Sequence, residues 1–202
     1  MPVHEFTPRL KTYMTARLND ESAPIVVTGA PVEDNSHYIL IATGYAMFRV
    51  SRLTYKMTFQ AYLHREPPGP GEGFHIHGNQ SIDFDWPLQQ WEKMKSGCKT
   101  PARLTPYFLE APSDKGKGVK QLRLLWADPL AIWMDTAILN TVDVRYGELK
   151  ASATEKDPLY FQDGDIESIF LPFRRGKKDG QALAEEAALA KAWCEQKAGT
   201  PR

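Results

Sequence analysis

The sequence predicts an α+β fold, in which a mainly antiparallel sheet carries a few packed helices and a further helix follows at the C-terminal end. Three observations predict it. Short apolar runs separated by glycine-containing turns are typical of strands. Amphipathic segments between and after these runs have the spacing of helices. The chain has 202 residues, 42% hydrophobic and 25% charged, and is long enough to bury a core without disulfides or metal ions.

The first part of the chain is expected to combine one helix with a hairpin. Residues 6–19 have the pattern of a short amphipathic helix, with Thr7 at the N-cap and Pro8 in the first turn. An apolar run ends at Gly44 and resumes directly after it, which is typical of two strands joined at a bend. The strands expected here cover residues 25–28, 38–43 and 45–50.

A strand and a loop are expected next. Residues 54–63 alternate apolar and polar side chains, so that Tyr55, Met57 and Phe59 share one face of a half-buried strand. Residues 65–73 contain three prolines and three glycines, so they are expected to form an exposed, protease-sensitive loop.

The second half of the body is expected to consist mostly of strands. One or two strands at 74–84 precede a helix that Asp85 caps, with Pro87 in its first turn. A second exposed loop covers residues 112–118. The further strands are expected at about 120–126, 131–134, 142–150 and 166–173, with a short helix within 135–142.

The last segment is expected to be separate from the rest. We divide the chain into an α+β body over residues 1–173 and a C-terminal helical appendage over residues 178–197. Leaving Trp193 in water would forgo about 2–3 kcal/mol of burial, so we expect the appendage to dock on its own body or on another subunit. Docked back toward Phe173, it would cover that end of the body; a frayed, exposed helix is the alternative.

Charge and cysteine content exclude some classes of protein. The 25 basic and 25 acidic side chains cancel, whereas a nucleic-acid-binding protein usually has a basic excess. Cys98 and Cys194 are too few for a structural zinc site, and no motif for a cofactor is present, so we expect none. A charged N-terminus and the lack of a run of ~20 apolar residues predict a cytoplasmic protein that does not enter a membrane.

His75 and His77 are the candidates for a metal site. Residues two apart in a strand point to the same side, so this pair could offer two imidazoles to one ion. His64, Asp83 or Asp85 would have to complete the site. Because no third and fourth ligand is evident, we expect no bound metal, and two exposed histidines beside a loop are the simpler interpretation.

Support for catalysis is weak. Lysines next to Cys98 would lower the pKa of its thiol, but an ordinary semi-buried thiol is the alternative. Asp163 and Asp165 flank Gly164, which indicates a tight turn. No Gly-x-Ser-x-Gly elbow is present, so no catalytic residue is assigned.

Two further segments each have a recognisable order of strands and turns. In the first, the run Ile25–Val27 is followed by the acidic turn Glu33–Asn35, the apolar strand Leu40–Gly44 and the arginine-containing strand Met47–Val50. In the second, Pro158 and apolar residues precede an acidic turn that contains glycine. The segment Ile169-Phe170-Leu171-Pro172-Phe173-Arg174 closes it.

These segments resemble the bacterial DNA polymerase sliding clamp. Clamp domains carry an apolar strand ending Ala-Thr-Asp-Gly, a strand with an arginine, and a closing strand of apolar-Met-Pro-Met-Arg type. Here the aspartate is absent, and the chain has room for a single such domain. The resemblance implies a clamp-like body with two similar βαβββ halves. It also implies a pocket for peptides of partner proteins, lined by Leu171, Pro172 and Phe173.

The resemblance leads to a functional expectation with two alternatives. We expect a non-enzymatic, clamp-like protein of a phage or other mobile element that acts in DNA replication or binds a replication protein. Its partner would be a protein, DNA contact would need an assembly, and a homo-oligomer is left open. The alternatives are an interaction or inhibitor protein unrelated to clamps and a metal-dependent enzyme that uses His75 and His77.

Overall fold

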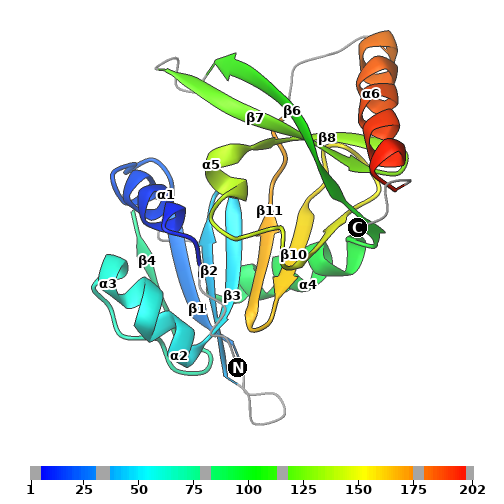
Figure 1. The fold of residues 1–202 in the computed structure, drawn as a ribbon. Helices are drawn as coiled ribbons and strands as arrows, with labels where there is room; N and C mark the ends of the chain where they lie inside the picture. The colour runs from blue at the N-terminus through cyan, green and yellow to red at the C-terminus, as the bar shows by residue number, and fades with distance from the viewer. Residues whose placement is uncertain (1–5, 31–36, 78–82, 113–117, 175–179, 199–202) are drawn as a thin grey trace.

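The computed structural model describes residues 6–30, 37–77, 83–112, 118–174 and 180–198. They form the α+β fold that the sequence predicts, with two sheets whose strand pairings are all antiparallel (Figure 1). None of the helices in these five ranges is long and apolar enough to cross a membrane.

One sheet has eight strands and the other has three. The larger has the order β4 (Gly73–Ile76), β1 (Ile25–Gly29), β2 (Tyr38–Thr43), β3 (Ala46–Ser51), β11 (Ile166–Phe170), β10 (Leu159–Asp163), β9 (Glu148–Ala151) and β5 (Thr100–Pro101). The smaller has the order β6 (Arg103–Pro112), β7 (Val119–Ala127) and β8 (Leu130–Asp135). The helical elements are α1 (Arg9–Leu18), α2 (Arg52–Thr54), η1 (Tyr55–Phe59), α3 (Gln60–Leu63), α4 (Asp85–Gly97), α5 (Thr136–Leu139) and α6 (Gly180–Ala198).

The elements stack in layers. α4 covers one face of the eight-stranded sheet. The other face packs against α1, the helical segment 52–63, α5 and the three-stranded sheet. α6 covers the outer face of the three-stranded sheet (Figure 1). Both faces of each sheet are therefore covered over much of their area, which accounts for the uninterrupted apolar run of β2.

The main core lies between the two sheets. Alternate residues of the smaller sheet, such as Leu125 and Ile132, point into it and belong to the same buried cluster as Phe48 and Phe161 of the larger sheet. The intervening residues of β7 and β8 point outward and form the surface on which α6 packs. This alternation follows from the two-residue period of a strand.

The C-terminal helix packs on its own chain. Ala190 and Cys194 of α6 are buried against Leu124 and Trp126. The Trp133 indole Nε1 donates a hydrogen bond to Glu186 Oε2 at 2.9 Å. Of the two docking arrangements expected for this helix, the structure has the one on its own body.

The strand expected at 54–63 is wrong, because this segment is helical. Its buried side chains are spaced by four residues, Tyr55, Phe59 and Leu63, and this spacing fits a helix as well as a strand. Met57, which strand alternation would bury, is 64% exposed. The Ser51 hydroxyl accepts a hydrogen bond from the Thr54 backbone N–H at 3.0 Å and so caps the helical segment.

Several other predictions need correction. The exposed loop at 65–73 is irregular as expected, but Pro67 and Pro68 in it are buried. The strand expected up to residue 173 ends at Phe170. The ten-residue strand β6 was not predicted. The expected helix at 6–19 and the hairpin with Gly44 at its bend are confirmed. Parts of the expected strand region 74–84 and loop 112–118 lie outside the described residues.

Candidate functional site

A groove lies over the turn between β2 and β3. It consists of two adjoining hollows of about 310 Å³ and 370 Å³, which share Tyr45, Lys120, Asp135 and Ile138 in their walls. The first hollow, the apolar end of the groove, extends to residues 171–174. The second, the basic end, extends along α1. Among the α6 side chains that the structure describes, none lines either hollow.

The segment that follows β11 forms the wall of the apolar end. The Leu171 backbone N–H donates to the Tyr45 carbonyl oxygen at 3.0 Å, and the Phe173 N–H donates to the Trp133 carbonyl oxygen at 2.8 Å. The segment therefore bridges the two sheets. Pro172 is buried, while Leu171 and Phe173 are half-buried and remain accessible from the groove. The three residues that the clamp resemblance assigns to a partner pocket thus lie together in one groove wall.

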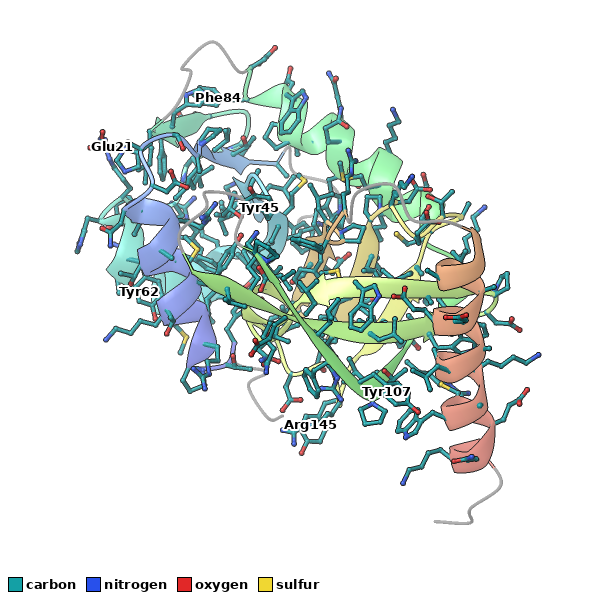
Figure 2. The ribbon with its side chains drawn as sticks, turned by 90° about the horizontal axis from the view of Figure 1, so that it is seen from above. Glu21, Tyr45, Tyr62, Phe84, Tyr107 and Arg145 are labelled. Atoms are coloured by element: carbon teal, nitrogen blue, oxygen red, sulfur yellow. The ribbon has the colours of Figure 1, made fainter. Side chains whose placement is uncertain are left out.

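Tyr45 stands at the centre of the groove and is 38% exposed. Figure 2 labels it, in a view from above, beside α1. Lys120 Nζ lies 5.4 Å from the Tyr45 ring centroid and 5.5 Å from that of Phe173. It is also 3.9 Å from Asp135 Oδ2, a long ion pair. Lys120 therefore holds a positive charge at the junction of the two hollows.

A buried tyrosine holds the β2–β3 turn that carries Tyr45. The Tyr13 hydroxyl lies 2.5 Å from Thr43 Oγ1, which in turn donates to the Ala46 carbonyl oxygen at 3.0 Å. Burial raises the pKa of Tyr13 to about 12, so the phenol stays protonated and can donate to Thr43. Gly44, with φ +57°, supplies the left-handed turn conformation that places Tyr45 over the groove.

The basic end begins at Arg17 of α1. Its guanidinium carbon lies 5.3 Å from the Tyr45 ring centroid, and one terminal nitrogen, NH2, lies 3.4 Å from Asp20 Oδ2. The other terminal nitrogen, NH1, is buried and has no hydrogen-bond partner among the described residues. Arg9, at the other end of α1, lines the same hollow and is exposed.

The structure does not bring His75 and His77 together. β4 ends at Ile76, and His77 has a left-handed backbone with φ 60°, so the alternation of a strand does not continue through the pair. The His75 ring stacks on Phe84 with 4.8 Å between centroids, whereas His77 Nε2 lies 2.8 Å from the Leu18 carbonyl oxygen. In the described part of the chain, no three histidine, cysteine, aspartate or glutamate side chains gather in a cluster that could hold a metal ion.

The residues considered as further metal ligands beside His75 and His77 have separate structural roles. His64 ends α3 in a left-handed conformation with φ 51°. Asp83 Oδ1 accepts a hydrogen bond from the Asp85 N–H at 3.1 Å, at the start of α4. Asp85 is the first residue of α4 and not its N-cap, so the capping that the sequence suggested for Asp85 is wrong.

Cys98 is not an activated thiol. Burial raises its pKa to about 11, and its Sγ donates to the Pro158 carbonyl oxygen at 3.2 Å. The lowered pKa considered for Cys98 is therefore wrong, because burial outweighs the nearby lysines. Cys194 of α6 is buried in the separate cluster between α6 and the smaller sheet. Asp163 and Asp165 flank a tight turn at Gly164, with φ 55°, as expected.

Sequence reasoning missed a polar cluster beneath α4. The Glu167 carboxylate accepts hydrogen bonds from Arg49 at 2.8 Å, Lys95 at 2.5 Å and the Tyr160 hydroxyl at 2.6 Å. Burial acts to raise the pKa of Glu167, but Lys95, Tyr160 and Arg49 together hold it below the ordinary value. Burial and Glu167 raise the pKa of Tyr160 well above its usual range. Arg49 of β3 lies directly opposite Glu167 of β11 in the strand pairing, and its role depends on that pairing.

Comparison of the chain with protein-family models, with curated protein sequences and with solved structures gave no match.

Proposed function

We propose that this protein is a non-enzymatic, clamp-like binding protein that takes a short segment of a DNA replication protein into the groove. The observation that carries the proposal is the position of Leu171, Pro172 and Phe173. They form a half-buried wall of an open hollow of about 310 Å³, in the size range of pockets that bind small ligands or side chains. The resemblance assigned these residues to a pocket from the sequence alone. Their position in the wall of a hollow is an independent observation that agrees with this assignment.

The order of elements also supports the proposal. One unit consists of α1 followed by the meander β1-β2-β3, and a second consists of α5 followed by the meander β9-β10-β11. The last strands of the two units pair antiparallel, β3 with β11, and α1 contacts α5. The clamp resemblance requires two similar halves, and this order and pairing of elements support them.

The chain also departs from the clamp pattern. β8 precedes α5, but no strand precedes α1 among the residues that the structure describes. A long insertion, which includes α4 and most of the smaller sheet, separates the two units. The edges of the larger sheet are β4, with four residues, and β5, with two residues that include Pro101. Such short edges offer little to a neighbouring subunit.

The proposal therefore gives the protein a partner-binding role rather than that of a closed ring. It acts in the cytoplasm on a protein partner, as the product of a phage or other mobile element, and DNA is contacted only within an assembly that the partner or further subunits complete. An interaction or inhibitor protein unrelated to clamps would use the same groove, and the identity of the partner separates the two.

Affinity capture from extracts of the source cells, with identification by mass spectrometry, tests the proposal. The full chain should capture a replication protein, and the double variant Leu171→Ala/Phe173→Ala should capture at least about tenfold less of it. Leu53→Ala is the control, because Leu53 is 67% exposed and does not line the groove. Capture that survives the double variant would overturn the proposal, and a partner from outside replication would favour the interaction protein unrelated to clamps.

A further inference from the structure

Resting on this proposed function, we infer that the groove selects a protein segment in which an acidic side chain lies close to an apolar anchor. The apolar residue occupies the hollow beside Leu171 and Phe173. The carboxylate lies in the basic end and accepts a hydrogen bond from Arg17.

The first observation is the state of Arg17. Its side chain is only 16% exposed, and its NH2 group already meets Asp20. Its NH1 group is buried without a hydrogen-bond partner in the described residues, and the Arg17 side chain lines the basic end of the groove. A buried donor without a partner costs free energy, and a carboxylate is the protein group that satisfies a guanidinium best. Arg17 is therefore placed to receive an acidic side chain.

The second observation is the charge of the groove. The chain as a whole has a formal net charge of zero. Among the described residues, the walls of the two hollows nevertheless contain four cationic side chains and one carboxylate, Asp135. The cationic side chains are Arg9, Arg17, Lys120 and Arg174. A positively charged groove on a protein of zero net charge attracts and orients an anionic segment.

The third observation favours a protein segment over a nucleic acid. Bases are usually held by stacking on aromatic rings. Here Arg17 and Lys120 lie within 5.4 Å of the Tyr45 ring centroid, and Lys120 lies 5.5 Å from that of Phe173. A stacked base would have to displace these cations. Leu171, Pro172 and Ile138 in the apolar end instead suit an aliphatic or aromatic side chain.

The test begins with selection from a phage-displayed library of random heptapeptides against the full chain. Selected peptides should be enriched in an acidic residue within three positions of an apolar one. The strongest is then synthesised together with a twin in which the acid is replaced by its amide. Fluorescence anisotropy on the unmodified protein should show on the order of tenfold weaker binding of the twin.

Protein variants locate the carboxylate. Arg17→Gln should weaken binding of the acidic peptide on the order of tenfold and leave binding of the amide twin unchanged. Arg145→Gln is the matched control, because Arg145 is 71% exposed and lies outside the groove (Figure 2). If Arg17→Gln lowers the thermal stability, the comparison of the two peptides on the unmodified protein still decides the matter.

The outcomes separate the inference from the proposed function. Peptides whose binding is lost in Leu171→Ala/Phe173→Ala but is equal for acid and amide would overturn the inference and leave the proposed function standing. Failure to select any peptide that depends on Leu171 and Phe173 would overturn both. Displacement of the acidic peptide by a dodecamer of thymidylate at equal or lower concentration would also overturn the inference, because the basic end would then bind phosphate.

Discussion

Glu167 pairs with two cationic side chains in the cluster beneath α4. Its side chain is 12% exposed, and Arg49 and Lys95 approach its two oxygens from β3 and α4. Arg49 also lies 3.9 Å from the Tyr38 ring centroid. The Glu167 side chain thus links α4 to the middle of the larger sheet. Removing its negative charge leaves the cations Arg49 and Lys95 beside a largely buried site.

The variant Glu167→Gln should therefore lower the free energy of unfolding by about 2 kcal/mol at pH 7. The folded protein lowers the pKa of Glu167 below the ordinary value of 4.5. The stabilisation is thus fully present above pH 4.5 and is lost as the pH falls through the lower, folded-state pKa. Urea unfolding at pH 7 and pH 3 should show a difference between the two proteins that shrinks at pH 3.

Glu148→Gln is the control for this prediction. Glu148 also pairs with a lysine, Lys150, but it is 72% exposed. Water screens such a pair, so the unfolding midpoint should move much less than for Glu167→Gln. Equal effects of the two substitutions would show that the cluster beneath α4 has no special role in stability.

At the scale of elements, the helical segment 52–63 makes a direct prediction. Phe59→Ala removes a fully buried ring and should lower the free energy of unfolding by about 3–5 kcal/mol. Met57→Ala should change it by less than about 0.5 kcal/mol, because Met57 is 64% exposed. Urea unfolding followed by circular dichroism measures both. A strand with Met57 and Phe59 on one buried face would instead make both substitutions costly.

The same segment shows which parts of the secondary structure could not be predicted from sequence patterns. The hairpin of β2 and β3 was predictable, because both of its strands are apolar runs and Gly44 marks the bend. Residues 54–63 satisfy a period of two in sequence, and only packing shows that every second apolar residue faces water. In β6, Pro106 and a register shift between Leu104 and Phe108 interrupt the alternation on which the prediction of a strand depends.

Only the part of the candidate site that is continuous in sequence was predictable. Leu171, Pro172 and Phe173 are consecutive, so a resemblance over a short segment was enough to select them. Tyr45 and Lys120 reach the same groove only through hydrogen bonds and strand pairing between distant parts of the chain. No local pattern in the sequence predicts that Tyr45 and Lys120 lie in the same groove.

At the scale of the whole molecule, α6 is the outermost layer and its removal should expose an apolar surface. Ala190→Glu places a carboxylate in a position that is fully buried against the smaller sheet. It should lower the free energy of unfolding by about 2–4 kcal/mol and increase the binding of the dye ANS. Thermal unfolding and dye fluorescence measure these effects.

Ala188→Glu is the matched control, since Ala188 lies on the exposed face of the same helix. It should leave both measurements unchanged. A chain that ends at Arg174 should behave like Ala190→Glu, with Leu124 and Trp126 exposed to solvent. If the truncated chain unfolds at the same temperature and binds no more dye, α6 contributes nothing to the stability of the body.

The pairing of β3 with β11 also determines when the chain can fold. It joins residues 46–49 to residues 167–170, so the centre of the larger sheet contains strands from opposite ends of the sequence. During synthesis on a ribosome, β3 is complete long before its partner leaves the exit tunnel. Contacts of such large sequence separation are formed slowly, because a long loop must close first. The N-terminal meander therefore keeps an unpaired strand edge until β11 has been synthesised, and the sheet can be completed only after that.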